Sequence, residues 1–135
     1  MPESDAHAKG RETRRHLMGD AMVDRLTHTA YDDPIMSDFV DYATEALWGL
    51  LWSRPGLDKK TRTLISVVST ATNARWAELA MYLRMARRQG WTEGELSEVL
   101  LHLAGYIGLP AAREAMLTAK EVFAEMRSED LRGDP

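Results

Sequence analysis

Apolar residues recur every three or four positions along this 135-residue chain, and alternation of apolar and polar residues never lasts for the length of a strand. A three-to-four spacing places apolar side chains on one face of a helix. Proline and glycine interrupt the pattern at Pro34, Pro55-Gly56, Gly90 and positions 108–110, which divides the chain into helix-sized segments. The pattern predicts an all-α fold of about six helices.

Start and stop signals locate these helices. Pro34 suits a first helical turn, Gly90 is typical just beyond a helix end, and Thr92 with Glu95 forms a capping box. The predicted helices cover residues 11–29 with a break near Gly19, 34–52, a segment capped by Asp58, 74–89, 92–107, and a segment that begins at Pro110. The apolar stripe expected on the second helix is Phe39, Val40, Ala43, Ala46, Leu47 and Leu50.

The length of the chain favours one domain, since two separate cores would each be too small to fold on burial alone. Residues 1–10 and 128–135 are polar, and we expect them to be flexible tails. The domain is therefore predicted to cover residues 11–127.

Two of the predicted helices are apolar on more than one side. In the helix at 74–89, Met81 and Met85 lie away from the main stripe, and in the helix at 92–107 Leu101 does so. A surface helix of a monomer needs only one buried stripe. The second apolar side therefore favours a homo-oligomer.

Charge and composition exclude several functions. The net charge is −4, which argues against nucleic-acid binding, and the absence of cysteine excludes thiol peroxidases and thiolate metal sites. No histidine and carboxylate spacing resembles a metal-ligand set, so no metal is expected. No segment resembles a signal peptide or a bilayer-spanning helix, and we expect a soluble, cytoplasmic protein without membrane partners.

Ordered motifs between about residues 10 and 125 resemble the 4-carboxymuconolactone decarboxylase family. The matching residues are Arg14-Arg15, Gly19-Asp20, Val23-Asp24, Trp48-Gly49, Trp52, Arg54-Pro55-Gly56-Leu57-Asp58, Thr61-Arg62-Thr63-Leu64, Glu78-Leu79, Leu83-Arg84, Gly90, Thr92, Glu95, Glu98-Val99-Leu100, Tyr106, Gly108 and Pro110-Ala111-Ala112. Each motif is weak alone, but their order and spacing together are specific.

The resemblance implies an all-helical protein without cofactors, assembled as a trimer of dimers. Decarboxylases of this family convert 4-carboxymuconolactone to an enol-lactone with loss of carbon dioxide. A related branch of alkylhydroperoxidases carries two cysteines and a histidine at the positions of Arg75, Glu78 and Tyr82, so peroxidase chemistry is excluded here. The chain departs from the decarboxylases at Tyr82, where they have histidine, and at Ile107, where cysteine is common.

Decarboxylation needs a donor beside the developing enolate and an acid that protonates it. Glu78 and Tyr82 are four residues apart, with Arg75 on the same row, so they are candidates for acid/base, phenol donor and carboxylate-binding cation. The alternatives are a surface ion pair between Arg75 and Glu78, and a packing role for Tyr82.

Further candidate site residues lie outside this row. His102 follows Glu98 by four residues, and it either forms an ion pair there or supplies the imidazole that position 82 lacks. Trp48 and Trp52 share one helical side and either pack in the core or form the wall of a substrate site. Arg62 either binds a substrate carboxylate or anchors its loop.

The sequence therefore predicts a decarboxylase acting on a small cyclic or conjugated organic acid. Two alternatives stay open, namely an isomerase, cyclase or dehydratase on the same scaffold, and an oligomeric binding protein without catalysis. The catalytic candidates are Glu78, Tyr82 and His102, and the substrate-binding candidates are Arg62, Arg75, Trp48 and Trp52.

Overall fold

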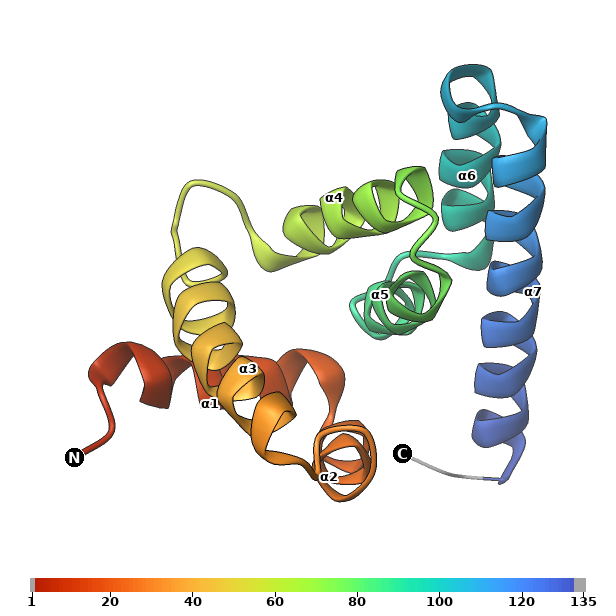
Figure 1. The fold of residues 1–135 in the computed structure, drawn as a ribbon. Coiled ribbons are helices and arrows are strands. Elements are labelled where there is room, and N and C mark those ends of the chain that lie inside the picture. Colours follow the sequence, from red (N-terminus) through yellow and green to blue (C-terminus); the bar gives the residue numbers. More distant parts are fainter. Residues whose placement is uncertain (1, 133–135) are drawn as a thin grey trace. The chain divides into compact units, whose positions relative to one another are not determined.

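The computed structural model describes residues 2–132, which form seven α-helices and one π-helix without any strand among them (Figure 1). The all-α prediction is confirmed. The helix count exceeds six because the helix expected at 11–29 is two helices, α1 (Asp5–Met18) and α2 (Asp20–His28), separated at Gly19. Residues 11–127, predicted as one domain, are divided between two compact units. The first unit ends at Lys59 and the second begins at Lys60, and each unit is described by itself.

The first unit contains α1, α2, α3 (Pro34–Ala43) and the π-helix η1 (Thr44–Leu51). Gly19 has a φ of 88°, which L side chains rarely adopt, so the chain turns between α1 and α2 at a residue without a side chain. Asp33 caps α3 by accepting a hydrogen bond from the Ile35 amide, and Pro34 occupies the first turn as predicted.

The flexible tail predicted for residues 1–10 is wrong for residues 5–10, which are helical. The Ser4 hydroxyl accepts a hydrogen bond from the His7 amide at 3.0 Å and so caps α1, and Gly10 is buried. At the other end, residues 128–132 continue α7 (Leu109–Arg132) instead of forming a tail. The remaining tail positions, 1 and 133–135, lie outside the described residues.

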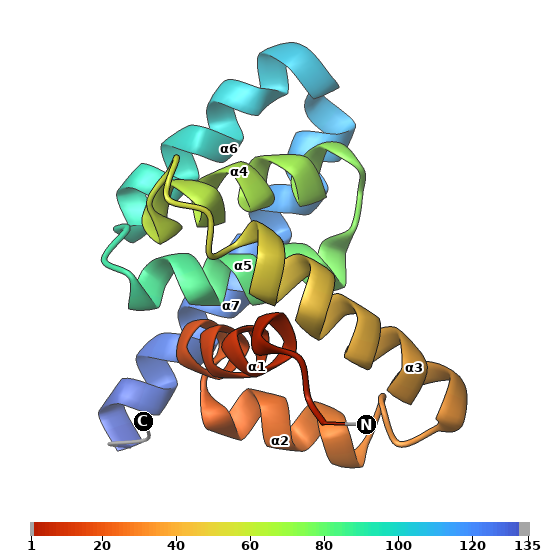
Figure 2. The same ribbon diagram turned by 90° about the vertical axis from the view of Figure 1, so that its left-hand side faces the viewer.

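The helices α1 and η1 cross with their backbones in contact (Figure 2). A Cβ atom on Gly10 would lie 1.8 Å from the carbonyl oxygen of Thr44, and one on Gly49 would lie 2.0 Å from that of Ala6. Both neighbours are backbone atoms that cannot rotate away. The crossing therefore requires glycine at both positions.

The helix predicted over residues 34–52 changes its hydrogen-bond pattern after Ala43. The Trp52 amide donates to the Leu47 carbonyl five residues earlier at 2.9 Å, which is π-helical spacing. The wider turns rotate the buried face, so that Trp48, Gly49 and Thr44 are buried. The predicted stripe is accordingly wrong at Leu50, which is 60% exposed, and it is also wrong at Phe39, which is 57% exposed on α3 before the wider turns begin.

The second unit contains α4 (Lys59–Thr72), α5 (Trp76–Arg88), α6 (Glu93–Ile107) and α7. α4 begins directly after Asp58, and both halves of the predicted Thr92–Glu95 capping box are formed at the start of α6. α6 and α7 lie side by side and run in opposite directions (Figure 1). The core that joins the four helices consists of Val67, Ala71, Leu79, Leu83, Ala86, Leu96, Leu100, Leu103, Ala115, Ala119, Val122 and Phe123.

A charged contact adds to this core between α5 and α7. The Arg84 side chain is only 12% exposed, and its guanidinium donates to Glu125 at 2.9 Å and to Glu129 at 2.7 Å. Charge-assisted hydrogen bonds at a poorly solvated site are stronger than exposed ones. Arg84 therefore fixes the position of the last turns of α7 against α5.

We predict that Gly10→Ala lowers the free energy of unfolding by about 2–3 kcal/mol or more, because the new methyl group overlaps backbone atoms of η1. Thermal unfolding followed by circular dichroism measures the change. The matched control is Gly105→Ala in α6, where nothing lies within 4 Å of the added Cβ atom. That variant should gain up to about 1 kcal/mol from helix propensity. Equal effects of the two substitutions would contradict the close crossing.

Candidate functional site

The burial of Leu79 and Leu83 fixes how α5 is rotated about its axis. Both side chains are fully buried, which leaves Tyr82 half-buried at the edge of the core and Glu78 exposed beside it. Since the two residues are four positions apart, they lie on the same flank of the helix. Tyr82 and Glu78 thus share one flank at the surface of α5, and their role in a site stays a prediction.

Arg75 is placed at the start of α5 by an unusual turn. Ala74 has a φ of 56°, in the left-handed region that costs a non-glycine residue about 1–2 kcal/mol. The Arg75 amide then donates to Thr70 at 2.9 Å, and its carbonyl accepts from Leu79 at 2.8 Å. The Arg75 side chain is exposed and makes no ion pair with Glu78 within residues 2–132, unlike the surface pair considered from the sequence.

His102 is exposed on α6, and its ring lies against Tyr106, with 5.2 Å between the ring centroids. The ion pair with Glu98 expected from the spacing is not formed in the described part of the chain. His102 also makes no hydrogen bond with Glu78 or Arg75 there. Within the described residues, His102 is therefore not linked to the α5 row, and it lies on α6 beside Tyr106, which is 78% exposed.

The remaining predicted residues lie on other elements. Trp48 and Trp52 are 5% and 3% exposed in the first unit, with ring centroids 5.2 Å apart. This arrangement agrees with core packing, and a contact with substrate stays a prediction. Arg62 is half-buried in the first turns of α4. Its role as a carboxylate ligand also stays a prediction.

An apolar hollow of about 510 Å³ lies between α6 and α7. Leu101 and Leu109 line it while remaining 57% and 75% exposed, and Arg113 is also among the residues that line it. Leu101 therefore faces away from the core, as predicted. This hollow includes neither Glu78, Tyr82 nor His102.

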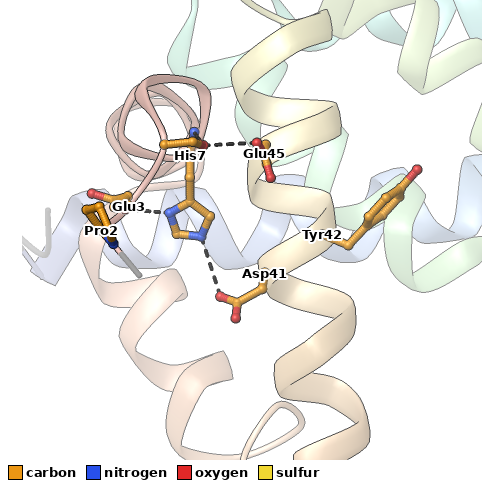
Figure 3. Close-up of a pocket in the computed structure, with 7 residues that line it drawn as sticks. Pro2, Glu3, His7, Asp41, Tyr42 and Glu45 are labelled. Atoms are coloured by element: carbon orange, nitrogen blue, oxygen red, sulfur yellow. Dashed lines mark hydrogen bonds and ion pairs between the residues drawn. The ribbon is translucent and has the colours of Figure 1, made fainter.

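A polar hollow of about 420 Å³ lies in the first unit, between the start of α1 and the α3–η1 helix (Figure 3). The His7 ring hydrogen-bonds to Glu3 through Nδ1, and its Nε2 lies 3.4 Å from the Asp41 carboxylate. The Ser4 hydroxyl donates to Glu45 at 2.9 Å (Figure 3). Three acidic side chains and one histidine thus face one another across this hollow.

These contacts shift the pKa values of Glu3 and of His7 itself. Hydrogen bonds from Arg11 and then His7 lower the pKa of Glu3 to about 2. The bond to Glu3 and the contact with Asp41 raise the pKa of His7 above 6.5. Sequence reasoning missed this cluster because it assigned His7 to a tail, although Ser4 followed by Asp5 is a recognisable helix start.

Among residues 2–132, no three histidine or carboxylate side chains are grouped closely enough to hold a metal ion. None of the helices within that range combines the length and hydrophobicity needed to cross a bilayer.

Comparison with known proteins gives consistent matches. A family model described as "Carboxymuconolactone decarboxylase family" matches residues 37–121. The chain is 36% identical to a 4-carboxymuconolactone decarboxylase of Acinetobacter baylyi, over 93% of this chain and 92% of that protein. It is 33% identical to the nitrosuccinic acid decarboxylase npaB of Metarhizium robertsii, over 87% of this chain and 81% of that protein. An uncharacterized 15.0 kDa protein of Paracoccus denitrificans is 35% identical over 60% of the chain.

We predict that His7→Asn destabilises the protein mainly at acidic pH. Because Glu3 and Asp41 raise the pKa of His7 above 6.5, protonated His7 favours the folded state. Its stabilising effect is complete below pH 6.5 and disappears as pH rises through the raised pKa. Urea unfolding across this pH range measures the difference in free energy of unfolding between His7→Asn and the wild type. When both proteins also carry Asp41→Asn, this difference should become smaller. A difference in free energy of unfolding that does not change with pH would contradict the prediction.

Proposed function

Since the chain belongs to the carboxymuconolactone decarboxylase family, we propose that it is itself a decarboxylase, acting on a small organic acid with an electron-withdrawing group near the carboxyl group that is lost. The observation that carries the proposal is the 36% identity to a 4-carboxymuconolactone decarboxylase across nearly the whole of both chains.

The substrates named for two relatives define the chemistry. Loss of carbon dioxide from nitrosuccinic acid leaves an electron pair that a nitro group delocalises, and loss from 4-carboxymuconolactone leaves one that an unsaturated lactone delocalises. In both cases the carbon–carbon bond to the carboxylate breaks, the electron pair moves into the acceptor group, and a proton is then added. The requirement is a donor for the developing anion and a proton source.

The α5 flank supplies both requirements in this proposal. Glu78 is the acid/base that delivers the proton, and Tyr82 donates a hydrogen bond to the developing anion. Their four-residue spacing and the half-buried position of Tyr82 at the core edge support this assignment. His102, beside Tyr106 on α6, is the reserve proton carrier.

The substrate-binding roles rest on charge and aromatic surface. Arg75 stands at the N-terminal end of the row formed with Glu78 and Tyr82, so its guanidinium is a candidate ligand for a substrate carboxylate. Arg62 is a second cation of this kind. Trp48 and Trp52 are proposed to form an apolar wall for the substrate.

Catalysis by Glu78 requires a cover that excludes water from an exposed carboxyl group, and we propose that self-association provides it. Leu101 and Leu109 leave an apolar hollow unfilled on the second unit, and burial of such side chains is favourable by about 1.5–3 kcal/mol each. The family resemblance indicates a trimer of dimers, and light scattering of the purified protein would measure the mass.

We predict that Glu78→Gln lowers kcat about 100- to 10,000-fold while the oligomer and its thermal stability are unchanged, because a proton donor is lost without loss of packing. Carbon dioxide release from nitrosuccinate and 4-carboxymuconolactone is the measurement. Glu98→Gln, which changes an exposed carboxylate on α6, is the matched control and should retain activity.

Wild-type protein that binds these acids without releasing carbon dioxide would instead indicate a non-catalytic binding protein. Proton transfer without carbon dioxide release would indicate an isomerase, cyclase or dehydratase.

Tyr82→His tests whether the tyrosine has changed the substrate range. The substitution restores the residue that the resembling decarboxylases carry, on a side chain that already contacts the core edge. We expect increased turnover of 4-carboxymuconolactone relative to nitrosuccinate. Tyr82→Phe keeps the ring but removes the donor, and should lower turnover of both acids. Full activity in Tyr82→Phe would show that the phenol only packs.

A further inference from the structure

Ala74 adopts a backbone conformation that its own side chain disfavours. Its φ is 56°, and every other residue with a positive φ among residues 2–132 is a glycine. In this left-handed conformation the Cβ atom approaches the following carbonyl oxygen, so the conformation is strained for alanine but not for glycine. Ala74 is also exposed, and core packing of its methyl group therefore does not offset the strain.

The turn at Ala74 ends α4 with a Schellman motif. The Ala74 amide donates to the Ala71 carbonyl at 3.2 Å, and the Arg75 amide donates to the Thr70 carbonyl at 2.9 Å. These two bonds require a left-handed residue directly before Arg75, a position that glycine usually occupies. The motif explains the φ of Ala74, but it does not explain why the residue is alanine.

The opposite end of α5 has the same motif with glycine. The Gly90 amide donates to Arg87 and the Trp91 amide donates to Ala86, both at 3.1 Å, and the φ of Gly90 is 102°. Glycine thus forms this turn in the same helix without strain. What the methyl group adds at Ala74 is a narrower range of backbone angles, which makes the turn more rigid.

Arg75 is the residue that this rigid turn holds in place. Its amide is bonded to Thr70 in α4, and its carbonyl accepts a hydrogen bond from the Leu79 amide in α5 at 2.8 Å. The backbone of Arg75 is therefore tied to two helices at once. Its side chain is exposed and makes no ion pair within residues 2–132, which leaves the guanidinium accessible to an anionic ligand.

We propose that Ala74 is a positioning residue, whose restricted left-handed turn holds Arg75 in a fixed place relative to Glu78 for binding of the substrate. This inference rests on the proposed function, which gives Arg75 and Glu78 their roles, and all three residues belong to the second unit. A donor with a fixed backbone loses less conformational freedom when a ligand binds. A displacement of about 1 Å within a site can lower a rate about 100-fold, so rigidity at this turn affects the reaction.

The test compares three variants by thermal unfolding. Ala74→Gly removes the strain and the restriction together, whereas Ala74→Ser keeps the Cβ atom and therefore both. Gly90→Ala introduces the same kind of strain at the far end of α5, where the added Cβ atom would meet only Lys60 Nζ at 4.0 Å. We expect Ala74→Gly to melt at the same or a higher temperature than the wild type, and Gly90→Ala to melt at a lower one.

Hydrogen exchange measures the rigidity of the turn without any substrate. The amides of Arg75 and Leu79 should exchange about 10-fold faster in Ala74→Gly than in the wild type, because local opening of the turn becomes easier even though global stability does not fall. In Ala74→Ser both amides should exchange at the wild-type rate. Unchanged or slower exchange in Ala74→Gly would overturn the proposal.

Turnover separates a positioning role from a structural one. Ala74→Gly should raise KM about 10-fold with a smaller change in kcat, since a carboxylate bound by Arg75 is present in substrate and transition state alike. Ala74→Ser should restore the wild-type KM, and Gly90→Ala should keep it despite its lower melting temperature. An unchanged KM in Ala74→Gly would overturn the role of Ala74 and leave the decarboxylase proposal intact.

A wild-type protein that releases no carbon dioxide would reject the decarboxylase proposal separately. Calorimetric titration with 4-carboxymuconolactone then decides the role of Ala74. Binding that is about 10-fold weaker in Ala74→Gly than in the wild type would support the positioning role. Equal binding by the two proteins, or no binding by the wild type, would overturn it.

Discussion

The position of every group on α5 depends on the burial of two leucines. Leu79 and Leu83 have no exposed surface and lie in the core formed by α4, α5, α6 and α7. Because helical positions have a fixed angular spacing, this burial determines that Tyr82 lies at the core edge and that Glu78 lies on the outer flank. The row proposed for catalysis is therefore held by apolar packing rather than by polar contacts among its own members.

The residues proposed for the site carry carboxylate, phenol, imidazole and guanidinium groups, which transfer protons or stabilise negative charge. Decarboxylation of an activated acid needs only these functions, because the substrate itself accepts the electron pair.

The sequence predicted the features that local chemistry determines. The Gly19 break, the start at Pro34 and the Thr92–Glu95 capping box all depend on residues within one helical turn, and all three are formed. It did not predict the left-handed Ala74, since alanine has no preference for that conformation, and tertiary packing must maintain it. The contact of His7 with Asp41 was equally inaccessible, because it joins segments more than thirty residues apart. The exposed position of Glu78 on α5 could not be deduced from its spacing alone.

The π-helix η1 has a consequence for how this segment tolerates changes in length. Its hydrogen bonds span five residues instead of four, so it contains one more residue than an α-helix joining the same points would need. Deleting a single residue there would restore the ordinary helical pattern between the same end points and change which residues of the segment face α1. Gly49 would then leave the crossing with α1, and the tryptophan pair would move off its buried face. Evolution can therefore vary side chains along η1 more readily than it can insert or remove residues.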